Sequence, residues 1–278
     1  MEAIFECTPG VHHLHGLDSS LYAPFDRIIR AYFAGHGGDV LEVAPLEGVV
    51  WPRVSLGNVS SHDFFSFDSF IMFSFYVVNR KRYETVFDVG ANLGLHSILL
   101  SRLGCDVHAF EPDPVHHELL MRNLAANGCH AVRVYRKAVS NRTGLADFVR
   151  VMGNTTASHI VGARGFYGEV EHFTVETVAF DDIAVEPDLM KIDIEGDERN
   201  VILGIEHRRW VAMDAMVEVH SERNSEAIFE YFRGSGINVF VQKLGWRKAE
   251  RVADMPRTNR EGNIFITSKP EMPWGEGA

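Results

Sequence analysis

Four side chains able to carry acid–base or metal chemistry follow two consecutive strand-like runs of the sequence. Asp193 and Glu195 close the first run, and Glu218 and His220 close the second. Residues two apart in an extended segment point the same way, and open α/β sheets bind ligands beyond the carboxyl ends of their strands. We therefore expect three carboxylates and one imidazole to converge on one rim of a sheet.

Two kinds of chemistry fit this cluster. His220, held by a carboxylate, suits general-base catalysis, because the ordinary imidazole pKa of about 6.5 permits proton abstraction near neutral pH. Alternatively, Asp193, Glu218 and His220 could bind a divalent cation, and their donor atoms favour Mg²⁺ or Mn²⁺. In a purely structural reading, Glu195 caps the following helix and Glu218 pairs with a nearby arginine. The sequence leaves these readings open.

A second motif, F-D-V-G-A-N-L-G at residues 87–94, lies where a strand-like run passes into a helical run. Glycines there allow a tight turn and let free helix N–H groups face a ligand. Asn92 and Leu95 stand where the dinucleotide fingerprint G-x-G-x-x-G needs its second and third glycines, which disfavours an NAD-dependent oxidoreductase. The motif instead suits a ligand without a pyrophosphate whose ammonium group Asp88 could attract. The amino-acid end of S-adenosylmethionine has that character.

Glu111 adds to this argument because it ends the next strand-like run, 21 residues after Gly90. An acidic residue at that place in a doubly wound sheet can accept hydrogen bonds from both ribose hydroxyls. The turn and Glu111 together imply a ligand that contains adenosine.

Short β-branched runs alternate with helical runs from residue 85 onward, which predicts a Rossmann-like, doubly wound α/β sheet. The expected strands are 85–89, 106–110, 131–139, 188–193, 215–219, 238–242 and 263–267, with the last two antiparallel to each other. The expected helices are 93–103, 114–127, 197–209 and 225–233.

Two regions depart from this rhythm. Residues 141–180 predict an inserted hairpin after the third strand, with strands at 145–151 and 173–178 joined by a polar, glycine-rich loop. Residues 1–80 lack the repeat and are expected to form an N-terminal cap on the substrate side of a domain spanning 81–270. Within the cap, the apolar stretch 64–78 is too short and too interrupted for a membrane span and predicts a buried helix.

Several motifs together resemble the FkbM family of methyltransferases. They are V-F-D-V-G-A-N-L-G at 86–94, F-E-P-D-P at 110–114, A-V-S at 138–140, K-I-D-I-E-G at 191–196 and V-E-V-H at 217–220. The resemblance covers about residues 83–220, roughly half of the chain, and K-I-D-I-E-G is its most distinguishing part.

The resemblance implies a class I S-adenosylmethionine-dependent methyltransferase fold, with a seven-stranded sheet whose last strand is antiparallel, and O-methylation of sugar or polyketide hydroxyls. By motif position, the methionine part of the cofactor would be held by Asp88, Gly90, Ala91, Asn92 and Gly94. Glu111 would hold the ribose, and the adenine would lie against Pro112, Ala138 and Val139. His96 and Ser97, which open the first helix, and Asp193 would also contact the cofactor.

The acceptor is expected to be a hydroxyl of a small molecule such as a sugar, a glycoside or a polyketide-type natural product. The D-P-P-Y-like element of amino-group methyltransferases is absent, and Asp193 to Gly196 stand in its place. In the polar loop, Thr156 and His159 are candidate substrate contacts. The alternative function is a catalytically silent protein that binds the cofactor as a sensor or scaffold.

Composition excludes other function classes. The formal net charge of -11 and the lack of any basic block disfavour nucleic-acid partners. The first residues do not resemble a signal peptide, which predicts a cytoplasmic protein. The three cysteines, Cys7, Cys105 and Cys129, form no C-x-x-C pair and predict neither a disulfide framework nor a zinc site. A homo-oligomer is left open.

Overall fold

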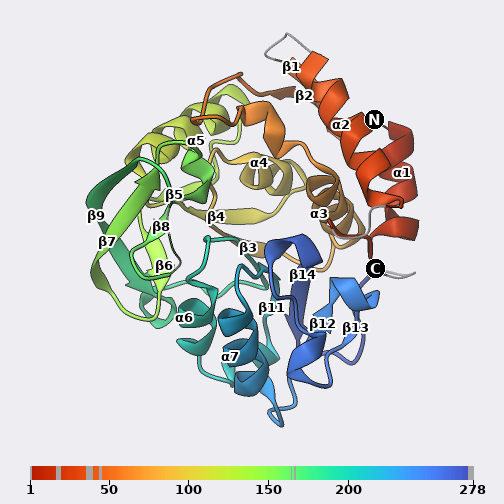
Figure 1. The fold of residues 1–278 in the computed structure, drawn as a ribbon, viewed down its shortest axis with the longest axis vertical. Coiled ribbons are helices and arrows are strands. Elements are labelled where there is room, and N and C mark those ends of the chain that lie inside the picture. Colours follow the sequence, from red (N-terminus) through yellow and green to blue (C-terminus); the bar gives the residue numbers. More distant parts are fainter. Residues whose placement is uncertain are drawn as a thin grey trace.

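A large mixed sheet runs through the centre of the molecule in this computed structural model (Figure 1). The structure describes residues 2–16, 20–35, 40–43, 46–163, 165 and 167–274. The first half of the sheet and its helices are β3 (Thr85–Val89), α4 (Leu95–Arg102), β4 (Asp106–Phe110), α5 (Pro114–Ala126) and β5 (Arg133–Tyr135). The second half comprises β10 (Leu189–Ile192), α6 (Glu198–Leu203), β11 (Asp214–Glu218), α7 (Glu222–Phe232), β12 (Asn238–Val241), β13 (Arg247–Lys248) and β14 (Asn263–Thr267).

The strand order is β13-β12-β14-β11-β10-β3-β4-β5. Strands β3, β4, β5, β10 and β11 are parallel, whereas β14 runs antiparallel to both of its neighbours. This confirms the doubly wound sheet with an antiparallel last strand. The two-residue edge strand β13 was not predicted and adds an eighth strand to the expected seven.

Alternate residues of each central strand enter two separate hydrophobic cores. On β3, Val86 packs with α3 (Phe67–Val78), α4 and α5, whereas Phe87 packs with the helices of the opposite face, α6 and α7. Ala109 and Phe110 divide in the same way on β4. Because successive strand residues point to opposite faces, a strand with apolar residues on both faces must be covered on both sides.

An inserted four-stranded sheet lies beside the main sheet, at the left of Figure 1. Its strands are β6 (Ala138–Ser140), β7 (Gly144–Val151), β8 (His159–Ile160) and β9 (Val170–Ala179). The expected hairpin is confirmed as the antiparallel pair β7 and β9. The expected single strand 131–139 is instead two strands, because the chain leaves the main sheet after Tyr135 and joins the inserted sheet at Ala138.

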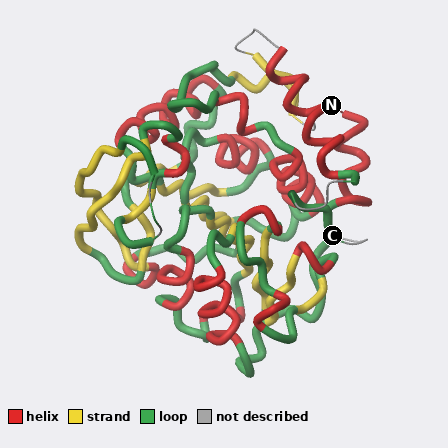
Figure 2. Tube along the Cα trace, in the orientation of Figure 1, coloured by secondary structure: helices red, strands yellow, loops and turns green. Residues whose placement is uncertain are grey.

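The N-terminal segment adds helices and a small two-stranded sheet at the right and top of the molecule (Figure 2), and it contacts α4 through its last helix. Its elements are α1 (Glu2–Val11), α2 (Tyr22–Gly35), β1 (Val40–Val43), β2 (Leu46–Val50) and α3 (Phe67–Val78). Ser66 caps α3 by accepting a hydrogen bond from the Ser69 backbone N–H. The expected buried helix is therefore confirmed, and none of the helices in the described ranges is long and apolar enough to span a bilayer.

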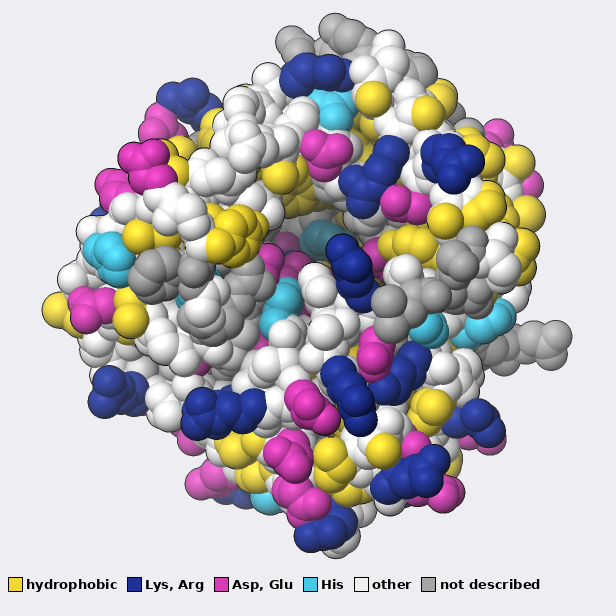
Figure 3. All heavy atoms as spheres, viewed as in Figure 1, with side chains coloured by type: hydrophobic (Ala, Val, Ile, Leu, Met, Phe, Trp, Pro, Cys, Tyr) yellow, Lys and Arg dark blue, Asp and Glu magenta, His cyan; other side chains and the backbone are white. Residues whose placement is uncertain are grey.

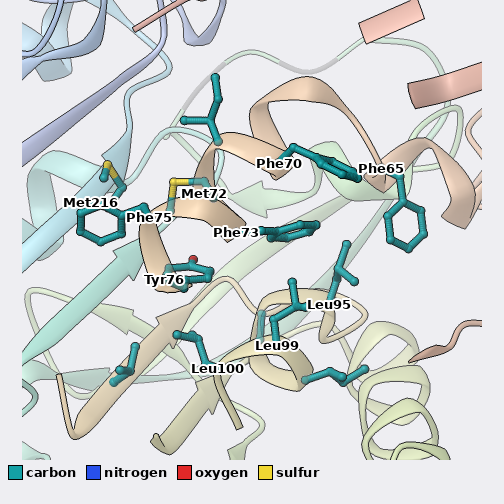
Figure 4. Packing of buried hydrophobic residues seen from close by; sticks show 14 of the residues in the cluster. Phe65, Phe70, Met72, Phe73, Phe75, Tyr76, Leu95, Leu99, Leu100 and Met216 are labelled. Atoms are coloured by element: carbon teal, nitrogen blue, oxygen red, sulfur yellow. The ribbon is translucent and has the colours of Figure 1, made fainter. Parts of the chain in front are cut away.

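Aromatic side chains of α3 pack directly on α4. Figure 4 shows Phe73 and Tyr76 facing Leu95, Leu99 and Leu100. Phe73 and Leu99 are each 1% exposed, so this contact is part of the main hydrophobic core. The N-terminal segment thus fixes where the first turn of α4 lies, next to the glycine motif.

Candidate active site

The glycine motif forms a tight turn between β3 and α4 that only glycine permits at two positions. Gly90 has a φ of +81°, and a Cβ added there would lie 1.9 Å from the carbonyl oxygen of Asp193. Gly94 has a φ of +88°, and its added Cβ would meet the Leu120 side chain at 2.4 Å. The N–H groups of Gly90 and Ala91 both donate to the carbonyl oxygen of Phe110 at 3.0 Å, which ties the turn to the end of β4.

A buried ion pair supports this turn from below. The Asp88 side chain is fully buried, and its carboxylate accepts a hydrogen bond of 2.6 Å from Ser97 and lies 3.3 Å from Lys191 Nζ. Lys191 Nζ also donates to the carbonyl oxygen of Gly90 at 3.0 Å. Burial alone would lower the pKa of Lys191, but the charges of Asp88 and Asp193 raise it, so the amine stays protonated.

Direct contact of Asp88 and Ser97 with the cofactor stays a prediction. The Ser97 hydroxyl donates to Asp88, the Asp88 carboxylate also pairs with Lys191 beneath the turn, and neither Asp88 nor Ser97 lines the three cavities next to the turn. Ala91 and Gly94 likewise shape the turn without lining these cavities. Sequence reasoning missed Lys191, although a lysine inside an otherwise apolar strand run was the available signal.

Beside the turn is the first cavity, which holds about 560 Å³ of empty space. The predicted cofactor residues that line it are Gly90, Asn92, Glu111, Pro112, Ala138, Val139 and Asp193. Glu111 is 5% exposed and accepts hydrogen bonds from the backbone N–H groups of Asn92, at 2.9 Å, and Asp113, at 2.8 Å. Burial raises the pKa of Glu111 to about 8. The strand-end acid and the glycine turn therefore share one cavity, as their spacing predicted.

The inserted sheet closes the outer side of the first cavity. Thr156 and Ile160 line it, and Thr155 Oγ1 lies 2.9 Å from His116 Nε2 on α5. His159, by contrast, is 1% exposed, and its Nδ1 lies 2.8 Å from the carbonyl oxygen of Ala157. Of the two candidate substrate contacts, Thr156 therefore faces a cavity, whereas His159 is buried within the insert, because β8 turns it inward against β7.

His220 brings the strand-end cluster together. Its Nε2 lies 3.1 Å from Glu195 Oε2 and 3.7 Å from Glu218 Oε1. Its Nδ1 lies 2.9 Å from Oε1 of Glu198, a fully buried carboxylate that sequence reasoning missed. Asp193, Glu195 and His220 each offer a ligand atom within 4.8 Å of the others. The expected convergence of these side chains on one rim is confirmed. The set whose ligand atoms lie close enough to hold a cation contains Glu195, whereas the sequence predicted Glu218 in that position.

Carboxylates close to both ring nitrogens favour the protonated form of His220. Burial alone would lower the pKa of His220, but the hydrogen bond with Glu198 and the charges of Glu195 and Glu218 raise it to about 10. Burial and the charge of Asp193 raise the pKa of Glu218 to about 8. A protonated imidazole cannot accept another proton, so this geometry favours a carboxylate over His220 as the proton acceptor.

A second cavity lies between the N-terminal segment and the strand ends, with about 760 Å³ of empty space. Asp63, Phe64 and Asp68 line it on one side, and His96, Lys191, Asp193 and Glu218 on the other. His96 faces this second cavity and not the first, and its Nδ1 lies 2.9 Å from the Tyr76 hydroxyl.

A bridging cavity adjoins both the first cavity and the second cavity, because it shares lining residues with each. Gly90, Asn92 and Glu195 also line the first, and Asp63, Phe64 and Glu218 also line the second. Asp193 lines all three. Near the middle of the face drawn in Figure 3 the surface is hollowed, and acidic and histidine side chains are visible inside the hollow.

The strand order, the glycine turn and Glu111 directly after β4 define a class I S-adenosylmethionine-dependent methyltransferase. The sequence model of the Methyltransferase FkbM domain matches residues 88–245, and the chain belongs to this family.

Two curated relatives illustrate this membership. The chain is 28% identical over 195 residues to the 31-O-demethyl-FK506 methyltransferase FkbM of Streptomyces tacrolimicus, across 58% of this chain and 75% of the relative. It is 24% identical over 166 residues to the hexuronic acid methyltransferase AglP of Haloferax volcanii, across 58% of this chain and 66% of the relative. Among solved structures, a precorrin-6y C5,15-methyltransferase from Geobacter metallireducens aligns with a TM-score of 0.39 and 14% identity, over 68% of this chain and 82% of that one.

Proposed function

We propose that this enzyme transfers a methyl group from S-adenosylmethionine to a hydroxyl group of a small molecule, such as a sugar, a glycoside or a polyketide-type natural product. The observation that carries the proposal is Asp193, which lines the first cavity, the bridging cavity and the second cavity. A carboxylate is thereby placed where a cofactor bound in the first cavity would meet an acceptor in the second. The printed names of the relatives, which refer to a 31-O position and to a hexuronic acid, agree with oxygen acceptors.

In the first cavity, this chain's residues fit an adenosine-containing cofactor. Glu111 has two carboxylate oxygens that can accept hydrogen bonds from ribose hydroxyls, and Asn92 and Asp113 hold that carboxylate in place. Pro112, Ala138 and Val139 supply the apolar wall for the base. S-adenosylmethionine supplies an electrophilic methyl group on a sulfonium, so the protein has to orient the acceptor and accept its proton.

Glu218 is the proton acceptor in this proposal. It lines the second and bridging cavities, and its pKa of about 8 lies near the operating pH, where general-base catalysis is most effective. Asp193 accepts a hydrogen bond from the hydroxyl group of the methyl acceptor and so positions that group. His220 stays protonated and fixes the Glu195 carboxylate through Nε2, so its role is to hold the rim in place.

A second mechanism uses a divalent cation bound by Asp193, Glu195 and His220. One observation favours it, because the ligand atoms of these three residues lie within 4.8 Å of one another. Two carboxylate oxygens and one imidazole fit Mg²⁺ or Mn²⁺. Binding would require His220 Nε2 to release its proton, and the cation would lower the pKa of the acceptor hydroxyl.

In this proposal, the N-terminal segment forms one wall of the cavity that binds the methyl acceptor. Asp63, Phe64 and Asp68 lie across the second cavity from Glu218. This is the role expected for residues 1–80. A cytoplasmic location and a homo-oligomer stay predictions.

Two experiments test the proposed function. Calorimetry should show micromolar binding of S-adenosylhomocysteine that Glu111→Ala weakens strongly, while the exposed control Glu118→Ala on α5 leaves it unchanged. Equal binding by Glu111→Ala and the control would refute the cofactor site. A screen of hydroxylated compounds with methyl-labelled cofactor should then reveal an acceptor whose methylation Glu218→Gln abolishes. Cofactor binding with no methylation of any acceptor would favour the silent scaffold.

A further inference from the structure

Three arginines from three different elements line one cavity on the far side of the 194–197 turn. Arg142 comes from the loop between β6 and β7, Arg199 from the first turn of α6 and Arg223 from the first turn of α7. This arginine cavity holds about 900 Å³ of empty space. Helices α6 and α7 pack side by side below the sheet (Figure 1). Three guanidinium groups therefore line one cavity in a chain whose net charge is -11.

Three arginines but a single acidic residue, Asp197, are among the described residues that line the arginine cavity. Within the described part of the chain, none of the three guanidinium groups has a carboxylate within 4.0 Å. Asp197 is the one acidic residue among the described lining residues, and its oxygens accept hydrogen bonds from Ser140, at 3.0 Å, and Asn200, at 2.6 Å. Burial raises the pKa of Asp197 above its ordinary value, although the hydrogen bonds from Ser140 and Asn200 and the charge of Arg199 oppose this shift.

The N-terminal end of α7 adds a second source of positive potential. Helix α7 has 11 residues, begins after the cap Ser221, and presents Ser221, Arg223 and Asn224 to the arginine cavity. The N-terminus of a helix carries partial positive charge and free N–H groups, which favour bound anions. Planar guanidinium groups bind phosphate and carboxylate oxygens in a bidentate manner.

We propose that the arginine cavity binds an oxyanion, namely the phosphate or carboxylate group of a ligand other than the methyl acceptor. The acceptor lies elsewhere, because the arginine cavity shares Ile160 and Asp197 with the first cavity but no lining residue with the bridging or second cavity. Asn224 connects this site to the active-site rim, since its side-chain amide donates to the Gly196 carbonyl oxygen at 2.8 Å and to Glu198. The inference does not depend on the identity of the acceptor.

Calorimetric titration with inorganic phosphate and, separately, with acetate at constant ionic strength tests the site and distinguishes phosphate from carboxylate. We expect saturable binding of one of the two anions, about tenfold weaker in Arg142→Gln and in Arg223→Gln, because each variant loses a charge-assisted hydrogen-bond donor. Both side chains are exposed, so either variant should fold and retain binding of S-adenosylhomocysteine. Arg247→Gln is the control, since Arg247 is exposed on the distant edge strand β13.

The proposal is overturned if neither anion binds saturably to the protein. It is equally overturned if Arg142→Gln and Arg223→Gln bind the anion as tightly as Arg247→Gln does. Loss of S-adenosylhomocysteine binding in Glu111→Ala concerns the first cavity alone, so failure of one proposal leaves the other intact.

Discussion

Replacing Glu198 by glutamine should destabilise the protein in a pH-dependent way. The Glu198 carboxylate is fully buried and accepts hydrogen bonds from the Gly196 N–H at 2.6 Å, from His220 Nδ1 at 2.9 Å and from the Asn224 amide. Glutamine removes the negative charge and presents an N–H donor to a site that contains only donors. The imidazolium of His220 then loses its closest partner in the interior.

The magnitude follows from the pKa of His220. Three carboxylates, against the effect of burial, raise it from the ordinary 6.5 to about 10, and each pKa unit corresponds to about 1.4 kcal/mol. The whole shift therefore represents about 5 kcal/mol, of which Glu198, the nearest and most buried carboxylate, supplies the largest part. We expect Glu198→Gln to cost about 2 to 3 kcal/mol of unfolding free energy at pH 6.

The sign of the pH dependence is fixed by the direction of the shift. A folded-state pKa above the unfolded value stabilises the native state fully below pH 6.5, and this stabilisation is lost as the pH rises through about 10. The difference between the native protein and Glu198→Gln should therefore shrink as the pH rises from 6 to 10. Urea unfolding in EDTA at several pH values measures it. The control is Glu222→Gln, an exposed glutamate in the first turn of α7. An equal loss at pH 6 and pH 10 would refute the imidazolium assignment.

Three further results are expected. Gly90→Ala should abolish binding of S-adenosylhomocysteine, because its Cβ would collide with the Asp193 backbone, whereas Gly10→Ala, which has open space around it, should bind normally. Lys191→Met should lower the unfolding free energy by about 3 to 5 kcal/mol in urea melts, because it leaves Asp88 buried without its partner; a loss below 1 kcal/mol would contradict the role of this ion pair. EDTA should leave methyl transfer intact if a carboxylate is the base, and restoration of lost activity by Mn²⁺ would instead establish the cation mechanism.

Local signals in the sequence were enough to place most elements. Asp113 caps α5 by accepting hydrogen bonds from two backbone N–H groups, and Pro114 occupies its first turn, so both features could be read directly from residue type. The expected helix 197–209 was too long, because α6 ends at Leu203, where Gly204 packs against Asn141. The split of the third strand also had no local signal, because it depends on which of two sheets each segment joins.

The cofactor side of the site was predictable because its residues lie in fixed positions relative to the strand ends. Gly90 and Glu111 line one cavity as expected. The contribution of Asp63 and Phe64 to the second cavity was not predictable in the same way, because no periodicity or spacing relates them to Glu218, more than 150 residues later in the sequence.

The sequence by itself determined the class of fold, the family and the set of strand-end residues, because strand alternation and turn chemistry are local properties. The tertiary structure alone decided their protonation and partners. Asp88 pairs with Lys191 beneath the turn, and His220 Nδ1 lies against Glu198, and neither partner was expected from residue type. The physical reason is that pKa values and hydrogen bonds depend on burial and on neighbours that only the folded chain brings within a few ångströms.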